Sequence, residues 1–165
     1  PATKDDELSR SIYLPQGTKI KVQMENGEYG EISGVKRIMA TSSAESDYYV
    51  ICMSAYHNPR LFDDFGADAL LFIHDYSKFS QRLLHALKQK FLPSWKIFSR
   101  DIIYYDPVLP NKDLSNTLFE FIKHFRYYYQ DEFRIAMKPP EPANKLQYID
   151  IDVGPLYDCC ELITL

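Results

Sequence analysis

The sequence predicts an α+β fold, with a mixed or mainly antiparallel sheet and two longer helices packed on it. Short apolar or alternating segments of strand length recur along the chain, while two longer segments carry apolar residues at helical spacing. Strands come in runs with helices inserted between them, which favours α+β over a doubly wound parallel sheet. The 165 residues, 45% apolar and 25% charged, suit one globular domain over 1–165, with 1–11 frayed.

The first third of the chain predicts a hairpin followed by single strands. Residues 18–24 alternate polar and apolar side chains, as in a half-buried strand. The Asn26-Gly27 pair predicts a type I′ turn, so residues 28–32 should return as the antiparallel partner. A further short strand is expected over 35–40, and the continuous apolar run 48–54 predicts a buried central strand.

The middle of the chain predicts one short and one long helix. Residues 58–66 begin with Asn-Pro, a typical N-cap and first helical residue, and end with a glycine stop. After an apolar strand over 69–74, Asp75 or Ser77 should cap a helix that runs to Phe91. The apolar residues that give this helix its stripe are Phe79, Leu83, Leu84, Leu87 and Phe91.

The last third predicts the second long helix and further strands. One or two strands are expected over 95–105, and Asp113 should then cap the helix. Further strands are expected over 128–138 and 146–153, with a turn at Gly154-Pro155. The apolar stripe of the second helix would consist of Leu114, Leu118, Phe121, Ile122 and Phe125.

Composition narrows the classes of function. Nineteen basic against 23 acidic residues give a formal net charge of −4, which argues against a sequence-independent grip on nucleic acid. The chain has no apolar run of about 18 residues, so no membrane partner is expected. Three cysteines, without a CxxC motif or paired histidines at metal-ligand spacing, predict no disulfide framework, no metal site and a cytoplasmic protein.

A polar row on the predicted strand 128–138 is the strongest candidate for a site. Side chains alternate along a strand, so Gln130, Glu132 and Arg134 would share one face and leave Phe133 and Ile135 on the apolar one. One interpretation is a solvated face with a Glu132–Arg134 ion pair worth at most about 1 kcal/mol. The other is the floor of a cleft, where Glu132 accepts a hydrogen bond from a ribose hydroxyl or stabilises a developing cation.

Other chemistries remain open at this point. A two-carboxylate hydrolase could draw on Asp63, Asp64, Asp106 and Glu132. The run 123–129 mixes cations with aromatic residues, as single-strand nucleic-acid binders do. Because the predicted helical stripe places several of those aromatic residues in the core, nucleic acid is not the expected partner.

Three segments resemble an uncharacterised bacterial domain family of unknown function. Residues 123–134 carry a lysine, tyrosines and Q-x-E-F-R in the order of that family's K…Y-x-Q-x-E-aromatic-R signature. Residues 50–54 resemble its hydrophobic-C-[LM]-S strand, and residues 102–107 resemble its V-x-Y-x-D strand. The resemblance covers roughly residues 48–135.

The Gln130-x-Glu132 segment also resembles the Q-x-E turn of ADP-ribosyltransferases. This resemblance implies NAD as the cofactor, with Glu132 as the catalytic carboxylate that polarises the nicotinamide ribose. Gln130 would occupy the position that directs the substrate. Arg134 would complete the catalytic set by keeping Glu132 ionised through charge pairing.

The same resemblance implies a cofactor pocket and a biological role. Ser54 would match the pocket serine on an earlier strand, with Tyr128 and His57 as further cofactor-binding candidates. The expected protein is then a bacterial or phage effector or toxin that acts on a protein substrate. The alternative is a non-catalytic interaction protein, such as an immunity factor that binds a partner protein through an acidic, aromatic surface.

Overall fold

The computed structural model describes residues 9–14, 19–32, 38–44, 48–108, 114, 117–140 and 148–164. Their contacts divide them into two compact units. The first unit is built from residues 48–102 and 129–164, and the second from the described residues of 9–44 and 103–128. Helices and mostly antiparallel strands occur together, which confirms the α+β class; the single domain stays a prediction.

The first unit contains a three-stranded antiparallel sheet. Its order is β5 (Tyr49–Ser54), β10 (Glu132–Lys138) and β7 (Lys96–Asp101), so β10 lies in the centre. The register places Ile135 opposite Ile51 on one side and Ser99 on the other. The strand expected over 48–54 forms over Tyr49–Ser54, but it lies at an edge of this sheet and its residues are half-buried or exposed, so the expectation of a buried central strand is wrong.

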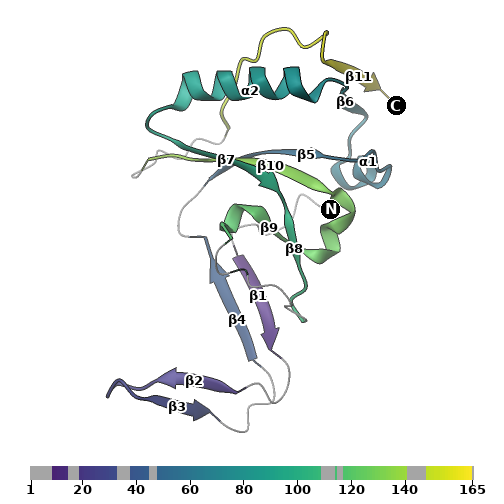
Figure 1. Ribbon diagram of the computed structural model, residues 1–165. Coiled ribbons are helices and arrows are strands. Elements are labelled where there is room, and N and C mark those ends of the chain that lie inside the picture. Colours follow the sequence, from purple (N-terminus) through teal and green to yellow (C-terminus); the bar gives the residue numbers. More distant parts are fainter. Residues whose placement is uncertain are drawn as a thin grey trace. The chain divides into compact units, whose positions relative to one another are not determined.

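One long helix covers one face of this sheet. Helix α2 (Tyr76–Phe91) runs along the sheet in Figure 1, and the Asp75 side chain caps it by accepting a hydrogen bond from the Lys78 backbone N–H at 3.1 Å. Its expected stripe is confirmed, because Phe79, Leu83, Leu87 and Phe91 are buried and Leu84 packs beside them. They meet Ile135 and Met137 of β10 in the core.

The described residues of the first unit also form three shorter elements. Helix α1 (Arg60–Phe65) ends at Gly66, which adopts the left-handed conformation expected of a C-cap. The Asn58 side chain accepts a hydrogen bond from the Arg60 backbone N–H at 3.1 Å, although Pro59 and not Asn58 occupies the cap position. Strand β6 (Ala69–Ile73) pairs antiparallel with β11 (Cys160–Thr164).

The last strand differs from the expectation over 146–153. Residues 148–153 form no strand, and 146–147 lie outside the described residues. Ile149, Ile151 and Val153 are half-buried and pack against the core. Their backbone has no strand partner, however, and the strand forms instead at β11, after the turn at Gly154.

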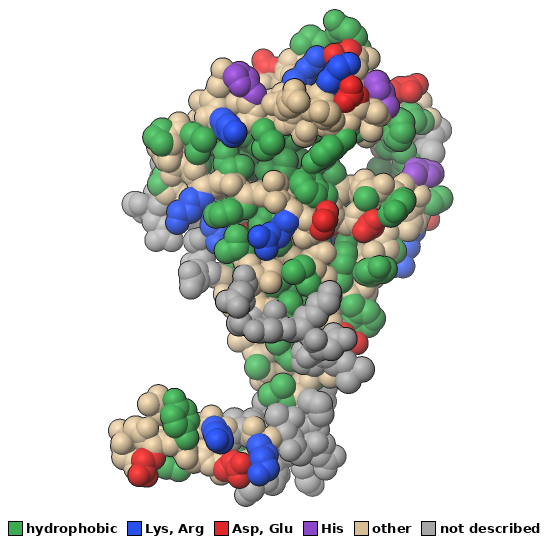
Figure 2. Space-filling model, in the orientation of Figure 1, with side chains coloured by type: hydrophobic (Ala, Val, Ile, Leu, Met, Phe, Trp, Pro, Cys, Tyr) green, Lys and Arg blue, Asp and Glu red, His purple; other side chains and the backbone are tan. Residues whose placement is uncertain are grey.

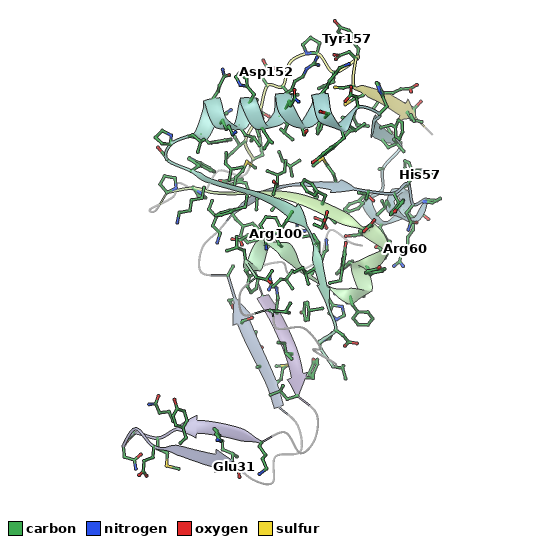
Figure 3. The ribbon with its side chains drawn as sticks, in the orientation of Figure 1. Glu31, His57, Arg60, Arg100, Asp152 and Tyr157 are labelled. Atoms are coloured by element: carbon green, nitrogen blue, oxygen red, sulfur yellow. The ribbon has the colours of Figure 1, made fainter. Side chains whose placement is uncertain are left out.

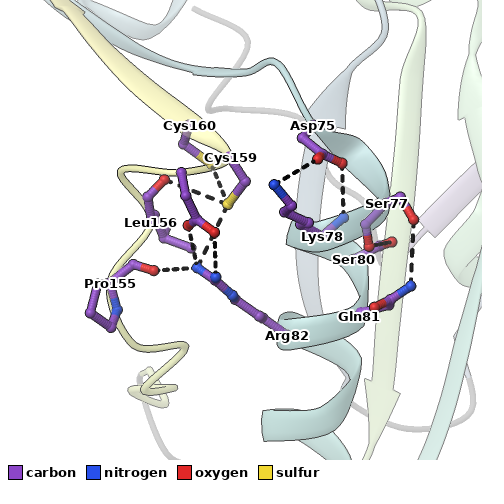
Figure 4. Close-up of polar contacts among 11 residues, drawn as sticks. Asp75, Ser77, Lys78, Ser80, Gln81, Arg82, Pro155, Leu156, Cys159 and Cys160 are labelled. Atoms are coloured by element: carbon purple, nitrogen blue, oxygen red, sulfur yellow. Dashed lines mark hydrogen bonds and ion pairs between the residues drawn. The ribbon is translucent and has the colours of Figure 1, made fainter.

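Arg82 ties the C-terminal segment to α2 (Figure 4). Its Nη1 lies 2.7 Å from Asp158 Oδ1 and its Nη2 lies 2.6 Å from Asp158 Oδ2. Nη1 also donates to the backbone carbonyl of Pro155. This two-pronged contact joins residues far apart in sequence, and it lowers the pKa of the Asp158 carboxyl below its ordinary value.

We expect this contact to make stability depend on pH in the acid range. A carboxyl whose pKa is lower in the folded state stabilises the fold above its unfolded pKa, and this contribution disappears as the pH falls through the folded pKa. The stability difference between wild type and Asp158→Asn should therefore be constant above about pH 5 and shrink below about pH 4. Urea unfolding of both proteins from pH 3 to 7 measures this difference. In an Arg82→Ala background the pH-dependent difference should disappear; if it persists there, Arg82 is not its cause.

The described residues of the second unit form three two-stranded sheets and short helical segments. β1 (Ser9–Leu14) pairs antiparallel with β4 (Ile38–Ser43), and β2 (Ile20–Gln23) with β3 (Tyr29–Ile32). The expectation that 1–11 is frayed is wrong for residues 9–11, which belong to β1; residues 1–8 and 35–37 lie outside the described residues.

The β2–β3 hairpin is confirmed, but its turn is of another type. A type I′ turn needs a positive φ at both Asn26 and Gly27, and only Gly27 has one, at 83°. The Gly27 backbone N–H donates to the Met24 carbonyl at 2.9 Å, and the Met24 N–H donates to the Glu28 carbonyl at 2.7 Å. This is the longer loop in which a tight turn is followed by a left-handed glycine.

The second long helix does not form over the described residues. The 3₁₀ helices η2 (Phe119–Phe121) and η3 (Phe125–Gln130) flank β9 (Ile122–His124), which pairs in parallel with β8 (Ile103–Tyr105). The expected cap Asp113 lies outside the described residues. Aromatic and β-branched residues, which have low helix propensity, fill this stretch, so the strand pairing outweighs the helical spacing.

Candidate functional site

The predicted Q-x-E segment forms a turn that leads into the central strand of the first unit. The strand expected over 128–138 begins only at Glu132, because residues 125–130 form η3. Asp131 connects them with a φ of 39°, the one positive φ among the described non-glycine residues. Gln130 therefore precedes the strand instead of sharing its face with Glu132 and Arg134.

Glu132 and Arg134 form a buried ion pair. Glu132 Oε1 lies 2.7 Å from Arg134 Nε and 2.7 Å from Arg134 Nη2, and the two side chains are only 6% and 1% exposed. The ion pair is thus confirmed, but the interpretation as a solvated strand face is wrong. Burial holds the two side chains in one geometry. In a surface ion pair, by contrast, the long side chains move among many geometries.

Ser54 lies beside this pair although it is distant in sequence. The register of β5 and β10 places Ser54 directly opposite Glu132. Its hydroxyl donates to the Gln130 carbonyl at 2.6 Å and to the Tyr56 carbonyl at 2.8 Å. The first unit therefore brings together four of the six predicted site residues, namely Ser54, Gln130, Glu132 and Arg134.

Gln130 contributes a polar side chain with unused donor capacity. The residue is only 4% exposed, and no acceptor among the described residues meets hydrogen-bonding distance and angle at its Nε2 atom. Burial raises the pKa of the Tyr129 phenol, and the Gln130 amide lies close enough to this group to lower it in part. A buried amide without a well-aligned acceptor is unfavourable, so its remaining donor capacity is suited to an oxygen of a ligand.

The other two predicted residues lie differently. His57 is exposed on the loop after β5, and its ring meets the edge of Phe62 at 5.8 Å between centroids. Figure 3 shows it near Arg60, at the α1 end of the first unit. Tyr128 belongs to the second unit, is 70% exposed and packs edge-on against Tyr104.

A second polar cluster, which the sequence did not reveal, braces the turn. The Tyr129 hydroxyl donates to Asp64 of α1, and Arg60 Nε lies 3.2 Å from the same carboxylate. The Arg60 guanidinium also stacks over the Tyr129 ring, 3.9 Å from its centroid. Burial, and then the Asp64 contact, raise the pKa of the Tyr129 phenol. The available signal was the four-residue spacing of Arg60 and Asp64 on one helix.

Arg100 adds a further cation on the same sheet face. The register places it opposite Arg134, and β7 carries it (Figure 3). Its side chain is exposed, in contrast to that of Arg134.

A small pocket on the opposite face of the sheet is not a nucleotide site. It lies between α2 and the sheet, measures about 20 Å³ and is lined by Tyr76, Ser80, Leu84, Met53 and Phe133, among others. Figure 2 shows hydrophobic side chains gathered below α2 in this region. Sites for drug-sized ligands measure roughly 300–1,000 Å³, so this pocket holds no more than a water-sized group.

Cys160 is not an activated nucleophile. Cys52, Cys159 and Cys160 are free thiols, and Cys159 Sγ lies 3.7 Å from Cys160 Sγ in a buried position. Burial and the neighbouring thiol raise the pKa of Cys160 to about 11. A reactive cysteine needs the opposite shift, so the adjacent pair is suited to packing.

No protein-family model, curated protein or solved structure matches the chain. The resemblances to the bacterial family and to ADP-ribosyltransferases therefore stay predictions. Within the described segments, no helix is long and apolar enough to cross a bilayer. The same segments hold no group of three or more His, Cys, Asp or Glu side chains placed to bind a metal ion.

Proposed function

We propose that the chain is an ADP-ribosyltransferase-like domain that uses NAD at the cluster of Ser54, Gln130, Glu132 and Arg134. The observation that carries the proposal is the contact between Ser54 and the Q-x-E turn, 76 residues apart in sequence. In the resemblance, a serine or tyrosine on an earlier strand shapes the pocket, and Ser54 matches that serine. A Q-x-E segment that occurred by chance would not be expected to lie beside such a serine, so the contact favours the proposal.

The chemistry of the cluster suits the cleavage of a glycosidic bond to a ribose. When bound, NAD supplies a nicotinamide leaving group and a ribose on which positive charge develops. Arg134 favours the ionised form of Glu132 and holds its carboxylate in place. A fixed negative charge stabilises a developing cation without reorganisation, and the Gln130 amide can donate to a ribose or carboxamide oxygen.

The setting of this activity is part of the same proposal. A cytoplasmic effector or toxin from bacterial or phage conflict would transfer the ADP-ribosyl group to a protein. The substrate protein is not specified by the residues of the cluster.

The expected result of Glu132→Gln is a loss of NAD turnover on the order of a hundredfold, since one electrostatic stabiliser is removed and the side-chain shape is kept. NAD consumption by purified protein measures it, with circular dichroism to confirm the fold. The matched control is Glu161→Gln, an exposed carboxylate on β11, which should leave turnover unchanged. Wild type without NAD turnover, or a fully active Glu132→Gln variant, would contradict the proposal.

A second candidate function is favoured by exposed apolar side chains on the β6–β11 sheet. Leu71 is 49% exposed and Leu162, directly opposite it on β11, is 67% exposed, so these two side chains share one face of the sheet; Phe72 and Ile163 are 49% and 40% exposed on the other face. Such a surface is typical of contact with another protein. The test is whether the protein forms a stable complex in extracts of its native host. Loss of the complex in Leu162→Asp, together with its retention in Glu132→Gln, would favour an interaction protein.

A further inference from the structure

We infer that Ser54, Ala55 and Asn58, here named the 54–58 clamp, position the turn that carries the site, and that Ser54 is a positioning residue instead of a cofactor contact. The three consecutive carbonyls of turn 129–131 each accept a hydrogen bond from the clamp. The donors are Asn58 Nδ2 at 3.2 Å, Ser54 Oγ at 2.6 Å and the Ala55 backbone N–H at 2.9 Å.

The turn needs such support because of its backbone conformation. Asp131 has a φ of 39°, a left-handed value that is unfavourable for a residue with a side chain. Backbone of this kind persists only where the surroundings over-determine it. The next residue along the chain is Glu132, so the direction in which its carboxylate leaves the turn depends on this conformation.

The hydroxyl of Ser54 is already engaged. A serine hydroxyl has one proton, and the Ser54 proton is directed at the carbonyls of Gln130 and Tyr56. It is therefore not available to donate to a bound cofactor. Ser54 can still affect catalysis strongly, because it holds the backbone from which the Gln130 and Glu132 side chains extend.

The clamp is itself anchored to helix α1. Asn58 uses its amide nitrogen for the turn and its amide oxygen for the Arg60 backbone N–H at 3.1 Å. From the other side, Tyr129 donates to Asp64, which pairs with Arg60. Helix α1 therefore fixes the clamp and the turn together, and a misplacement of about 1 Å at such a site can cost roughly a hundredfold in rate.

The inference rests on the proposed function for its catalytic part, and its structural part can be tested without NAD. The variants are Ser54→Ala, Ser54→Thr, which keeps the hydroxyl, and Asn58→Asp, which keeps the oxygen that accepts from Arg60 and loses the amide donor. Ser77→Ala, at the start of α2, is the control. Amide hydrogen exchange is followed at Ala55 and Ile102, whose N–H groups donate to the carbonyls of Asp131 and Glu132.

Ser54→Ala and Asn58→Asp should speed exchange at both amides by about fivefold, the effect of one lost hydrogen bond, and leave the β6–β11 amides unchanged. Ser54→Thr and Ser77→Ala should exchange like wild type. Unchanged exchange in Ser54→Ala and Asn58→Asp would overturn the inference, whether or not the protein consumes NAD.

The kinetic test separates positioning from cofactor contact. In Ser54→Ala, kcat for NAD should fall at least tenfold with KM nearly unchanged, and Ser54→Thr should restore it. A raised KM with unchanged kcat would show that Ser54 binds the cofactor directly and would overturn the assignment. Wild type without NAD turnover would contradict the proposed function alone, because the exchange data still decide whether the clamp exists.

Discussion

Arg134→Met is expected to lower the free energy of unfolding by about 3–5 kcal/mol, the cost of leaving one charge of a buried pair without its partner. Arg134 is only 1% exposed, and its guanidinium contacts Glu132 Oε1 through two nitrogen atoms. Methionine fills most of the volume but gives Glu132 no charge to pair with. Denaturant unfolding of wild type and variant measures the difference.

Two further variants make this prediction specific. Adding Glu132→Gln to Arg134→Met also removes the buried negative charge that Arg134 contacts, so the double variant should be more stable than Arg134→Met alone. Arg100→Met, on the same face of the neighbouring strand but exposed, is the control and should cost much less. Equal losses for Arg100→Met and Arg134→Met would show that burial of the pair is not the cause.

Ile135→Ala is expected to cost roughly 2–5 kcal/mol through lost apolar burial and the cavity that remains. Ile135 is 3% exposed and lies in the core with Leu83 and Leu87 of α2. Leu162→Ala, at a position 67% exposed on β11, is the matched control and should cost far less. A change below about 0.5 kcal/mol for Ile135→Ala would contradict the assignment of this face to the core.

Sequence patterns predicted the elements that are stabilised mainly by residues close in sequence, such as a helix cap, a hairpin turn or a single apolar face. Helix α2 has a side-chain cap at Asp75 and an uninterrupted apolar stripe, and both are visible in the sequence. The β2–β3 hairpin was visible from Asn26-Gly27 and the flanking alternation. In each case the sequence pattern and the final packing favour the same structure.

Elements that form only by pairing with residues far away in the sequence could not be predicted from local patterns. The spacing of Phe121, Ile122 and Phe125 is helical, yet β9 forms because β8 offers a parallel partner. Likewise the alternation of Ile149 and Ile151 describes a buried face without a strand, because pairing depends on a neighbour that periodicity does not identify.

The candidate site was predictable in part. Its residue types followed from the spacing of Gln130, Glu132 and Arg134, and the resemblance supplied Ser54. The left-handed Asp131 and the Tyr129–Asp64 brace were not predictable, because neither leaves a periodic signal in the sequence. Burial of the Glu132–Arg134 pair was also missed, since a run of charged residues on a strand usually faces water.

The central position of β10 has a consequence for synthesis on the ribosome. β5 and β7 each pair with β10 and not with one another, and the chain that builds the second unit is made before β10 emerges. Until then both outer strands present unpaired backbone groups, a state prone to intermolecular association. The three-stranded sheet of the nascent chain can therefore close only after β10 has been synthesised, which adds long-range pairing of the kind that slows folding.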